Sequence, residues 1–257
     1  MDDATTETEL RTVGLLGGMS PASTTVYYEE IVAGVNDARG GHAAAPIAAF
    51  SVDFADVEPM VRDDRWDEAG AYLAERARRV ERAGAEFLVT ATNTMHRVAD
   101  EIAAAIEIPF VHVVDPVADA ARDRGIDTLG VLGTRATMAG EFYHDRFADR
   151  GVDTLAPDPG TQAALDRIVF EELVHGNCRD DSRERFRAAI DRLRDRGAEG
   201  VVFGCTEIEL LLDGDALPGP AFDTTALHVD RAVDLSLGRR PLPASRDGER
   251  ESRGEQQ

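Results

Sequence analysis

Two polar turns contain the residues of this sequence whose types and spacing point to chemistry. The first, TNTMH at residues 92–96, follows the apolar run 87–89, and the second, GCTE at residues 204–207, follows the apolar run 201–203. Ligands of open α/β sheets bind beyond the carboxyl ends of the strands, so polar side chains at these positions are candidate ligand contacts. The structural alternative is that Thr92 or Asn93 only caps the following helix.

Cys205, in the second turn, is the most reactive side chain of the two motifs. A thiol has an ordinary pKa of about 8.5, and nearby amides, cations or a helix N-terminus convert it into a thiolate that can accept a proton. Gly204 in front of it allows a ligand to approach the backbone closely. A small buried thiol without a chemical role is the alternative. The other cysteine, Cys178, matches no motif, and two cysteines make neither a disulfide framework nor a four-ligand zinc site.

An internal repeat relates the two turns to each other. The segment RAGAEFLVTATNTMH at 82–96 corresponds to DRGAEGVVFGCTEIE at 195–209, and VGLLGGMS from residue 13 corresponds to LGVLGTRAT from residue 129. The offset between Gly84 and Gly197, 197 − 84 = 113, aligns Thr92 with Cys205. A repeat of ~115 residues has the size of a domain. Two such domains facing a shared cleft would bring Thr92 and Cys205 to opposite faces of a ligand, which suits removal of a proton from one face of a carbon and its addition to the other.

The elements that must position these turns alternate between short apolar runs and helical patterns. This alternation predicts an α/β fold of two similar Rossmann-like parallel-sheet domains, related by a pseudo-twofold and with the active site between them. The first domain is expected at 12–106, completed by 215–238, the second at 107–214, and disordered tails at 1–11 and 239–257. Strands are expected within 13–18, 46–52, 86–89, 109–114, 128–132 and 197–204, and near residue 155. Helices are expected at 66–84, 98–106, 161–176, 181–196 and 224–237, and three more are expected to begin at residues 21, 116 and 137. A loop is expected at 213–224.

The charge balance narrows the range of partners. The chain has 49 acidic and 28 basic residues, a formal net charge of -21, and every basic residue is Arg rather than Lys. Such a surface repels phosphate, which argues against nucleic acid and anionic membranes as partners. No apolar run approaches the roughly 20 residues of a membrane span, and the acidic N-terminus does not resemble a signal peptide, so we expect a cytoplasmic protein. Dense carboxylates without Lys predict adaptation to concentrated salt.

Taken together, the motifs resemble those of the aspartate/glutamate racemases, the amino-acid racemases that work without pyridoxal phosphate. GLLGGMS at 14–20, TNTMH at 92–96, GCTEIELL at 204–211 and FDTTALH at 222–228 support the resemblance, which covers residues 12–238. It implies an enzyme without cofactor or metal, a homodimer, and an acidic amino acid, aspartate or glutamate, as substrate. In the family, one thiolate removes the α-proton and the opposite thiol returns a proton to the other face.

This sequence departs from the family at one of the two thiols. Cys205 matches the second family cysteine, whereas the position of the first is occupied by Thr92. A threonine hydroxyl is far less acidic than a thiol and is no comparable base, although it can donate a proton. By resemblance, Cys205 then acts on the L-enantiomer and Thr92 on the opposite face, and catalysis from the D side is expected to be poorer.

The remaining candidate residues surround these two positions. Asn93, Thr94 and Thr206 are expected to donate hydrogen bonds to the substrate α-carboxylate, with helix capping as the alternative. Further candidates are the cleft-lining residues Met19 and Ser20, Thr134 and Thr137 at the matching turn of the second half, the possible proton relays His96 and Glu207, and His228. His96 as an ordinary hydrogen-bonded helix residue is an equally good interpretation. Because the chain has no Lys, Arg62 and Arg135 are candidates for binding the substrate side-chain carboxylate, with a surface ion pair as the alternative for each.

Two other functions fit part of the pattern. The same scaffold with a single cysteine suits a decarboxylase or another isomerase, because one thiol is enough to protonate a carbanion. A dicarboxylate-binding protein that has lost the first thiol, and with it catalysis, is a candidate from another class. The two turns are complete apart from Thr92, which argues against such decay.

The acidic composition generates a prediction about salt. We expect the melting temperature to be higher in about 1 M KCl than in low salt, because a Debye length of roughly 3 Å removes the repulsion among the carboxylates. Differential scanning calorimetry measures this difference. A parallel series in sucrose is the control, since excluded cosolvents also strengthen burial. A melting temperature that is highest in low salt would contradict the prediction.

Overall fold

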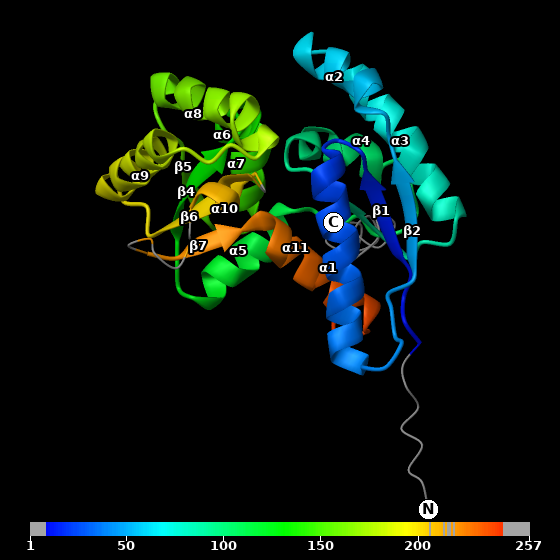
Figure 1. The fold of residues 1–257 in the computed structure, drawn as a ribbon. Coiled ribbons are helices and arrows are strands. Elements are labelled where there is room, and N and C mark those ends of the chain that lie inside the picture. The colour runs from blue at the N-terminus through cyan, green and yellow to red at the C-terminus, as the bar shows by residue number, and fades with distance from the viewer. Residues whose placement is uncertain (1–8, 206, 213, 215–216, 218, 244–257) are drawn as a thin grey trace, which may run out of the picture. The chain divides into compact units, whose positions relative to one another are not determined.

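The computed structural model describes residues 9–243 except 206, 213, 215–216 and 218 (Figure 1). The chain forms two compact units, each built on a parallel β-sheet. The first unit contains Met1–Ala91, Val98–Val111 and Val229–Gln257, and the second contains Thr92–Arg97 and His112–His228. The predicted α/β class with parallel sheets is therefore confirmed. None of the described helices is both long and apolar enough to cross a membrane.

The sheet of the first unit has the strand order β2-β1-β3. Its strands are β1 (Val13–Gly17), β2 (Ile47–Ser51) and β3 (Phe87–Thr90), and its helices are α1 (Pro21–Arg39), α2 (Phe54–Arg62), α3 (Trp66–Arg82) and α4 (Ala99–Ala103). Every residue of β1 and β3 is buried, as expected for parallel strands covered on both faces. This burial explains why both strands are continuous apolar runs in the sequence.

The sheet of the second unit has the strand order β5-β4-β6-β7. Its strands are β4 (Thr128–Gly133), β5 (Asp153–Leu155), β6 (Gly200–Gly204) and β7 (Ala221–Asp223). One core packs between the sheet and α8 (Pro159–Glu171) and α9 (Asp180–Asp195), and another between the sheet and α5 (Val114–Asp123) and α7 (Glu141–Asp149). Figure 1 shows α9 and α5 on opposite sides of these strands. The short helices are α6 (Arg135–Met138), α10 (Glu207–Leu211) and the 3₁₀ turns η1 (Thr94–Val98) and η2 (Leu173–His175). The last helix, α11 (Thr224–Ser236), begins in the second unit and ends in the first.

The Gly-Ala-Glu segments of the repeat have the same structural role in both units. Gly84 and Gly197 follow a helix with φ of 97° and 106°, a left-handed conformation that favours glycine. Glu86 then accepts a hydrogen bond of 2.6 Å from the amide of Thr12 in front of β1. Glu199 accepts two, of 2.8 and 3.0 Å, from the amides at the start of β4. Each carboxylate thus fixes its strand to the start of the neighbouring strand.

Several predicted elements differ from the structure. The predicted strand at 109–114 contributes only one parallel bridge, between Phe110 and Leu88, and α5 begins at Val114. The predicted loop at 213–224 contains β7, a short strand that the surrounding glycines and prolines conceal in the sequence. The helix predicted from residue 137 is divided into α6 and α7, because Gly140 between them has an extended backbone, with φ of -78° and ψ of 115°.

The division into units also differs from the predicted boundaries at 106 and 214. Residues 92–97 belong to the second unit although they follow β3 of the first, and β7 with the start of α11, as far as His228, belongs to the second unit. The TNTMH turn and the GCTE turn are therefore parts of the same unit. Of the two predicted disordered tails, residues 1–8 and 244–257 lie outside the described residues.

Candidate active site

Thr92 and Cys205 occupy similar places in the second unit. Thr92 is half-buried, two residues past β3, and leads into η1. Cys205 is half-buried directly after β6, and α10 begins two residues later at Glu207. Thr206, a predicted substrate contact, lies outside the described residues. Parallel strands thus end at both turns, as the apolar runs in front of them predict.

The side chain of Asn93 is bonded to other protein groups at both ends. Its Nδ2 donates a hydrogen bond of 2.9 Å to Oγ1 of Thr224, and its Oδ1 accepts one of 2.9 Å from the hydroxyl of Tyr143. Oγ1 of Thr224 in turn donates to the carbonyl oxygen of Phe203, at 2.9 Å. Tyr143 and Thr224 were not recognised from the sequence as site residues, although the FDTTALH motif contains Thr224.

A row of threonine hydroxyls lies at the start of η1 and α6. Oγ1 of Thr94 is 3.4 Å from Oγ1 of Thr134, which is 3.2 Å from Oγ1 of Thr137. Thr134 also caps α6, because its Oγ1 accepts a hydrogen bond of 3.4 Å from the amide of Thr137. A Cβ added to Gly204 would lie 2.9 Å from Cγ2 of Thr137, so this glycine allows β6 to approach the row. The structure therefore brings the predicted residues Thr94 and Thr134 together.

Cys205 has a carboxylate as its hydrogen-bond partner. Its Sγ donates a hydrogen bond of 2.8 Å to Oε2 of Glu207. Burial raises the pKa of the Cys205 thiol well above its ordinary value, and the negative charge of Glu207 raises this pKa further. The thiol is therefore protonated at rest, and Glu207 is within reach as the acceptor of its proton.

His96 uses both ring nitrogens to hold the backbone around Thr92. Its Nε2 is 3.1 Å from the amide of Val113, and its Nδ1 is 2.8 Å from the carbonyl oxygen of Thr92. Since an amide donates and a carbonyl accepts, Nδ1 carries the proton and Nε2 accepts from Val113. Burial, followed by the nearby His228, lowers the pKa of His96 to about 3. These contacts favour a role in fixing the turn, and the predicted proton relay stays a prediction.

The other predicted histidine, His228, is buried next to His96. The centroid of the His96 ring lies 6.0 Å from that of His228 and 4.5 Å from that of His112. Burial lowers the pKa of His112 as well, and the proximity of His96 lowers it further. In the described part of the chain, no three His, Cys, Asp or Glu side chains form a group suited to a metal ion.

Met19 and Ser20 belong to the first unit. Met19 is buried, and Ser20 caps α1 by accepting a hydrogen bond of 3.3 Å from the amide of Ser23. Ser20 and Thr134 thus have the same capping role in the two halves of the repeat. The role of Met19 and Ser20 in binding substrate stays a prediction.

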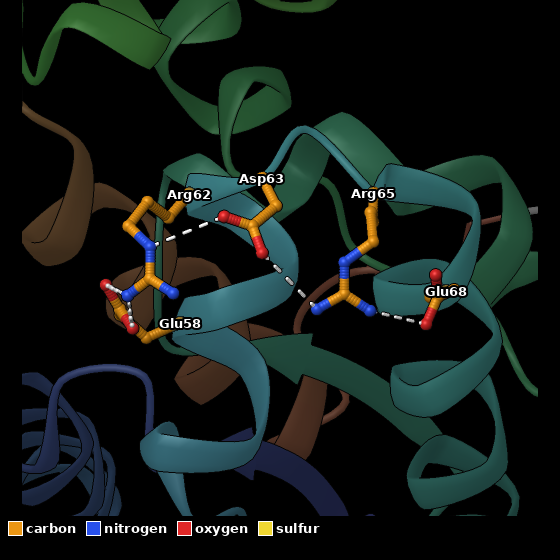
Figure 2. Close-up of polar contacts among 5 residues, drawn as sticks. All are labelled: Glu58, Arg62, Asp63, Arg65 and Glu68. Carbon is orange, nitrogen blue, oxygen red and sulfur yellow. Dashed lines mark hydrogen bonds and ion pairs between the residues drawn. The ribbon is translucent and has the colours of Figure 1, made fainter.

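Of the two candidate cations for the substrate side chain, Arg62 already contacts carboxylates. Arg62 lies 2.9 Å from Glu58 and 3.4 Å from Asp63, and Figure 2 shows this chain of ion pairs continuing through Arg65 to Glu68. The Arg62 side chain is 61% exposed, so these pairs contribute little to stability. Arg135 is exposed. Its backbone amide, rather than its guanidinium, donates a hydrogen bond of 2.6 Å to Asp166. Neither contact tests a role in binding substrate.

The family assignment comes from comparison with known sequences. The pattern described as Asp/Glu/Hydantoin racemase matches residues 16–232. The chain belongs to this family. A candidate Asp/Glu racemase from Yersinia pestis has a solved structure with 41% identity and a TM-score of 0.85, covering 89% of this chain and all (100%) of that one. An aspartate racemase homologue from Pyrococcus horikoshii OT3 has 28% identity and a TM-score of 0.77, with 88% and 99% coverage.

Curated relatives of this racemase carry the names of specific enzymes. The broad specificity amino-acid racemase RacX of Bacillus subtilis is 22% identical over 88% of this chain and 98% of its own length. A glutamate racemase of Roseiflexus is 35% identical over 57% of this chain and 53% of its own length. Racemases are isomerases, so the predicted family and enzyme class are confirmed. A variant of arylmalonate decarboxylase, at 15% identity and a TM-score of 0.54, shares the fold alone.

The buried histidines generate a prediction about pH. Because the pKa of His96 is about 3 in the folded state and about 6.5 when unfolded, only the unfolded chain binds this proton between these values. The free energy of unfolding should therefore fall on acidification within this pH window. Each histidine that stays neutral in the folded state contributes about 1.4 kcal/mol per pH unit. Urea unfolding from pH 7 downward measures the slope.

Replacement of His96 tests its share of the slope. His96→Gln should reduce the slope by about one proton, or about 1.4 kcal/mol per pH unit. His42→Gln, at an exposed histidine, is the matched control and should retain the wild-type slope. An unchanged slope in His96→Gln would show that His96 accepts a proton in the folded state.

Proposed function

We propose that this racemase interconverts the enantiomers of an acidic amino acid, aspartate or glutamate, through Cys205 and Thr92. The observation that carries the proposal is the hydrogen bond from the Cys205 thiol to Glu207 at the carboxyl end of β6. A half-buried thiol beside a carboxylate is a paired acid and base, as abstraction of an α-proton requires. Relatives named as a glutamate racemase and an aspartate racemase homologue support the substrate class.

Each step of the proposed reaction moves one proton. Glu207 accepts the Sγ proton of Cys205, and the thiolate then removes the α-proton of the L-amino acid. The electron pair of the broken C–H bond is delocalised into the substrate α-carboxylate. The hydroxyl of Thr92 donates its proton to the opposite face of the carbanion, and water returns a proton to the resulting alkoxide. Glu207 then releases its proton to the hydroxide that is left, which restores the starting state. Side chains and water complete this cycle without a cofactor.

The two directions of the reaction place different demands on the site. From the L side, a thiolate of raised basicity removes the proton, which needs Glu207 to accept the Sγ proton first. From the D side, Thr92 has to act as the base, whereas the protonated Cys205 is already a suitable acid. The proposal therefore predicts slower α-proton exchange from the D side. The kcat/KM for inversion is equal in both directions, because the two enantiomers have equal free energy.

The threonine row is the proposed binding site of the substrate α-carboxylate. Thr94 and Thr134 place two hydroxyl oxygens 3.4 Å apart within the unit that contains Cys205. Hydroxyl groups that donate to an ionised carboxylate make strong, charge-assisted hydrogen bonds. Asn93 contributes less directly, because its carboxamide is already bonded to Tyr143 and Thr224.

Exchange of the α-proton in heavy water tests the proposal. We expect L-aspartate or L-glutamate to exchange faster than the D-enantiomer, as measured by NMR. Cys205→Ala should slow exchange from the L side by about 100-fold or more, and Glu207→Gln by at least about 10-fold, since each removes an acid–base group. Cys178→Ala, at the exposed cysteine outside the motifs, is the matched control and should retain the wild-type rate.

The same assay separates the proposal from its alternatives. Binding of both enantiomers without exchange would indicate a dicarboxylate-binding protein, and release of CO₂ from a substituted malonate would indicate a decarboxylase. Thr92→Cys should accelerate exchange from the D side, because a thiol replaces the weaker base. An unchanged ratio between the D and L rates in this variant would show that Thr92 is not the second proton-transfer residue.

A further inference from the structure

The carboxamide of Asn93 is part of a buried chain of hydrogen bonds that the proposed reaction does not use. Asn93 is 9% exposed and Tyr143 and Thr224 are each 0% exposed. Three bonds of 2.9 Å connect Tyr143, Asn93, Thr224 and the carbonyl oxygen of Phe203. Removal of any member would leave another buried polar atom without its partner.

The direction of each hydrogen bond in this chain is determined by its last acceptor. The carbonyl of Phe203 can only accept, so the Thr224 hydroxyl donates to it and accepts from Nδ2 of Asn93. Oδ1 of Asn93 then faces the hydroxyl of Tyr143, which donates. Burial raises the pKa of the Tyr143 phenol, which keeps it protonated as a donor. Three bonds that point the same way polarise and strengthen one another.

The chain connects the backbones of the two proposed proton-transfer residues. Asn93 follows Thr92 directly, and Phe203 precedes Cys205 by two residues on β6. Gly204 lies between Phe203 and Cys205, and the hydroxyl of Tyr143 is close to it. A Cβ added to Gly204 would lie 3.6 Å from this hydroxyl oxygen. The turn that contains Thr92 is thus fixed to the end of the strand that positions Cys205.

We propose that Tyr143 and Thr224 are positioning residues of the racemase, which act through Asn93 to hold Thr92 in place relative to Cys205. This inference rests on the proposed function. Reactions that need two groups on opposite faces of one carbon are sensitive to placement, and an error of about 1 Å can cost about 100-fold in rate. Neither residue needs to touch the substrate for this role.

Positioning has a consequence that simple stabilisation lacks. Exchange of the α-proton of an L-amino acid needs only Cys205, whereas racemisation also needs Thr92 on the opposite face. A loosened chain should therefore reduce inversion more than exchange. The ratio of deuterium incorporated into the L-enantiomer to D-enantiomer formed measures this difference in one reaction.

The experiment compares variants of Tyr143 and Thr224 in heavy water with L-aspartate or L-glutamate. Thr224→Val and Tyr143→Phe should each raise the ratio of exchange to inversion about 10-fold, by misplacing Thr92. The KM for exchange should stay close to that of the wild type, because the substrate contacts are retained. Thr224→Ser keeps the hydroxyl and should restore the wild-type ratio. Thr225→Val is the control at a neighbouring buried threonine, whose backbone amide bonds to Asp223.

Several results would overturn the inference. An unchanged ratio in folded Thr224→Val and Tyr143→Phe, with melting temperature and circular dichroism as checks, would show that the chain only stabilises the unit. A raised KM with an unchanged ratio would show a role in binding. If Thr224→Val does not fold, Tyr143→Phe retains the ring volume and decides the question. Absence of exchange and inversion in the wild type would instead refute the proposed function, and the inference with it.

Discussion

A buried carboxamide needs a partner for each of its polar atoms, and Asn93 finds them on two different elements of the second unit. The hydroxyls of Tyr143 on α7 and Thr224 at the start of α11 satisfy it, and Thr224 continues to β6. Because the interior offers no water in exchange, the backbone turn around Asn93 has little freedom. His96 restricts the same turn from the other side through the carbonyl of Thr92. The hydrogen bonds of Asn93 and His96 thus determine the position of Thr92.

Carboxylates have structural roles in this acidic protein as well as a surface role. Glu86 and Glu199 accept hydrogen bonds from amides at the starts of β1 and β4, and Glu81 accepts two more, from the amides of residues 107 and 108. Each carboxylate thus supplies a hydrogen-bond acceptor for backbone amides, which need one wherever water is excluded. A part of the acidic excess therefore belongs to the architecture of the sheets, and reducing the net charge at these positions would disturb the strands.

The sequence predicted the features that depend on local pattern. The apolar runs of β1, β3, β4 and β6 and the two Gly-Ala-Glu segments are visible in the letters, because buried parallel strands and left-handed glycines restrict residue types strongly. The pairing of Thr94 with Thr134, two residues separated by 40 positions, is found in the structure, and both were candidates. The carboxylate partner of Cys205 is two residues away and was named from the motif.

The missed features depend on contacts between distant segments. Tyr143 is 50 residues from Asn93 and Thr224 is 131 residues away, and nothing in the local sequence of either marks it as a partner. The strand β7 has only three residues, and its pairing with β6 decides its conformation. The interaction of His96 with the amide of Val113 likewise depends on where α5 begins. From its residue type alone, His96 could be either a proton relay or an ordinary hydrogen-bonded residue.

The membership of residues 92–97 in the second unit limits how this protein can be divided. The repeat suggests an ancestral module of one sheet and its helices, and such a module would end with its own turn. Here the turn that follows β3 packs in the unit of β4–β7. A gene fragment that encodes only the second half would lack Asn93, and the hydroxyls of Tyr143 and Thr224 would lose their partner. A recombinant that takes its first half from a relative would therefore conserve these hydrogen bonds only where that half carries an asparagine at position 93.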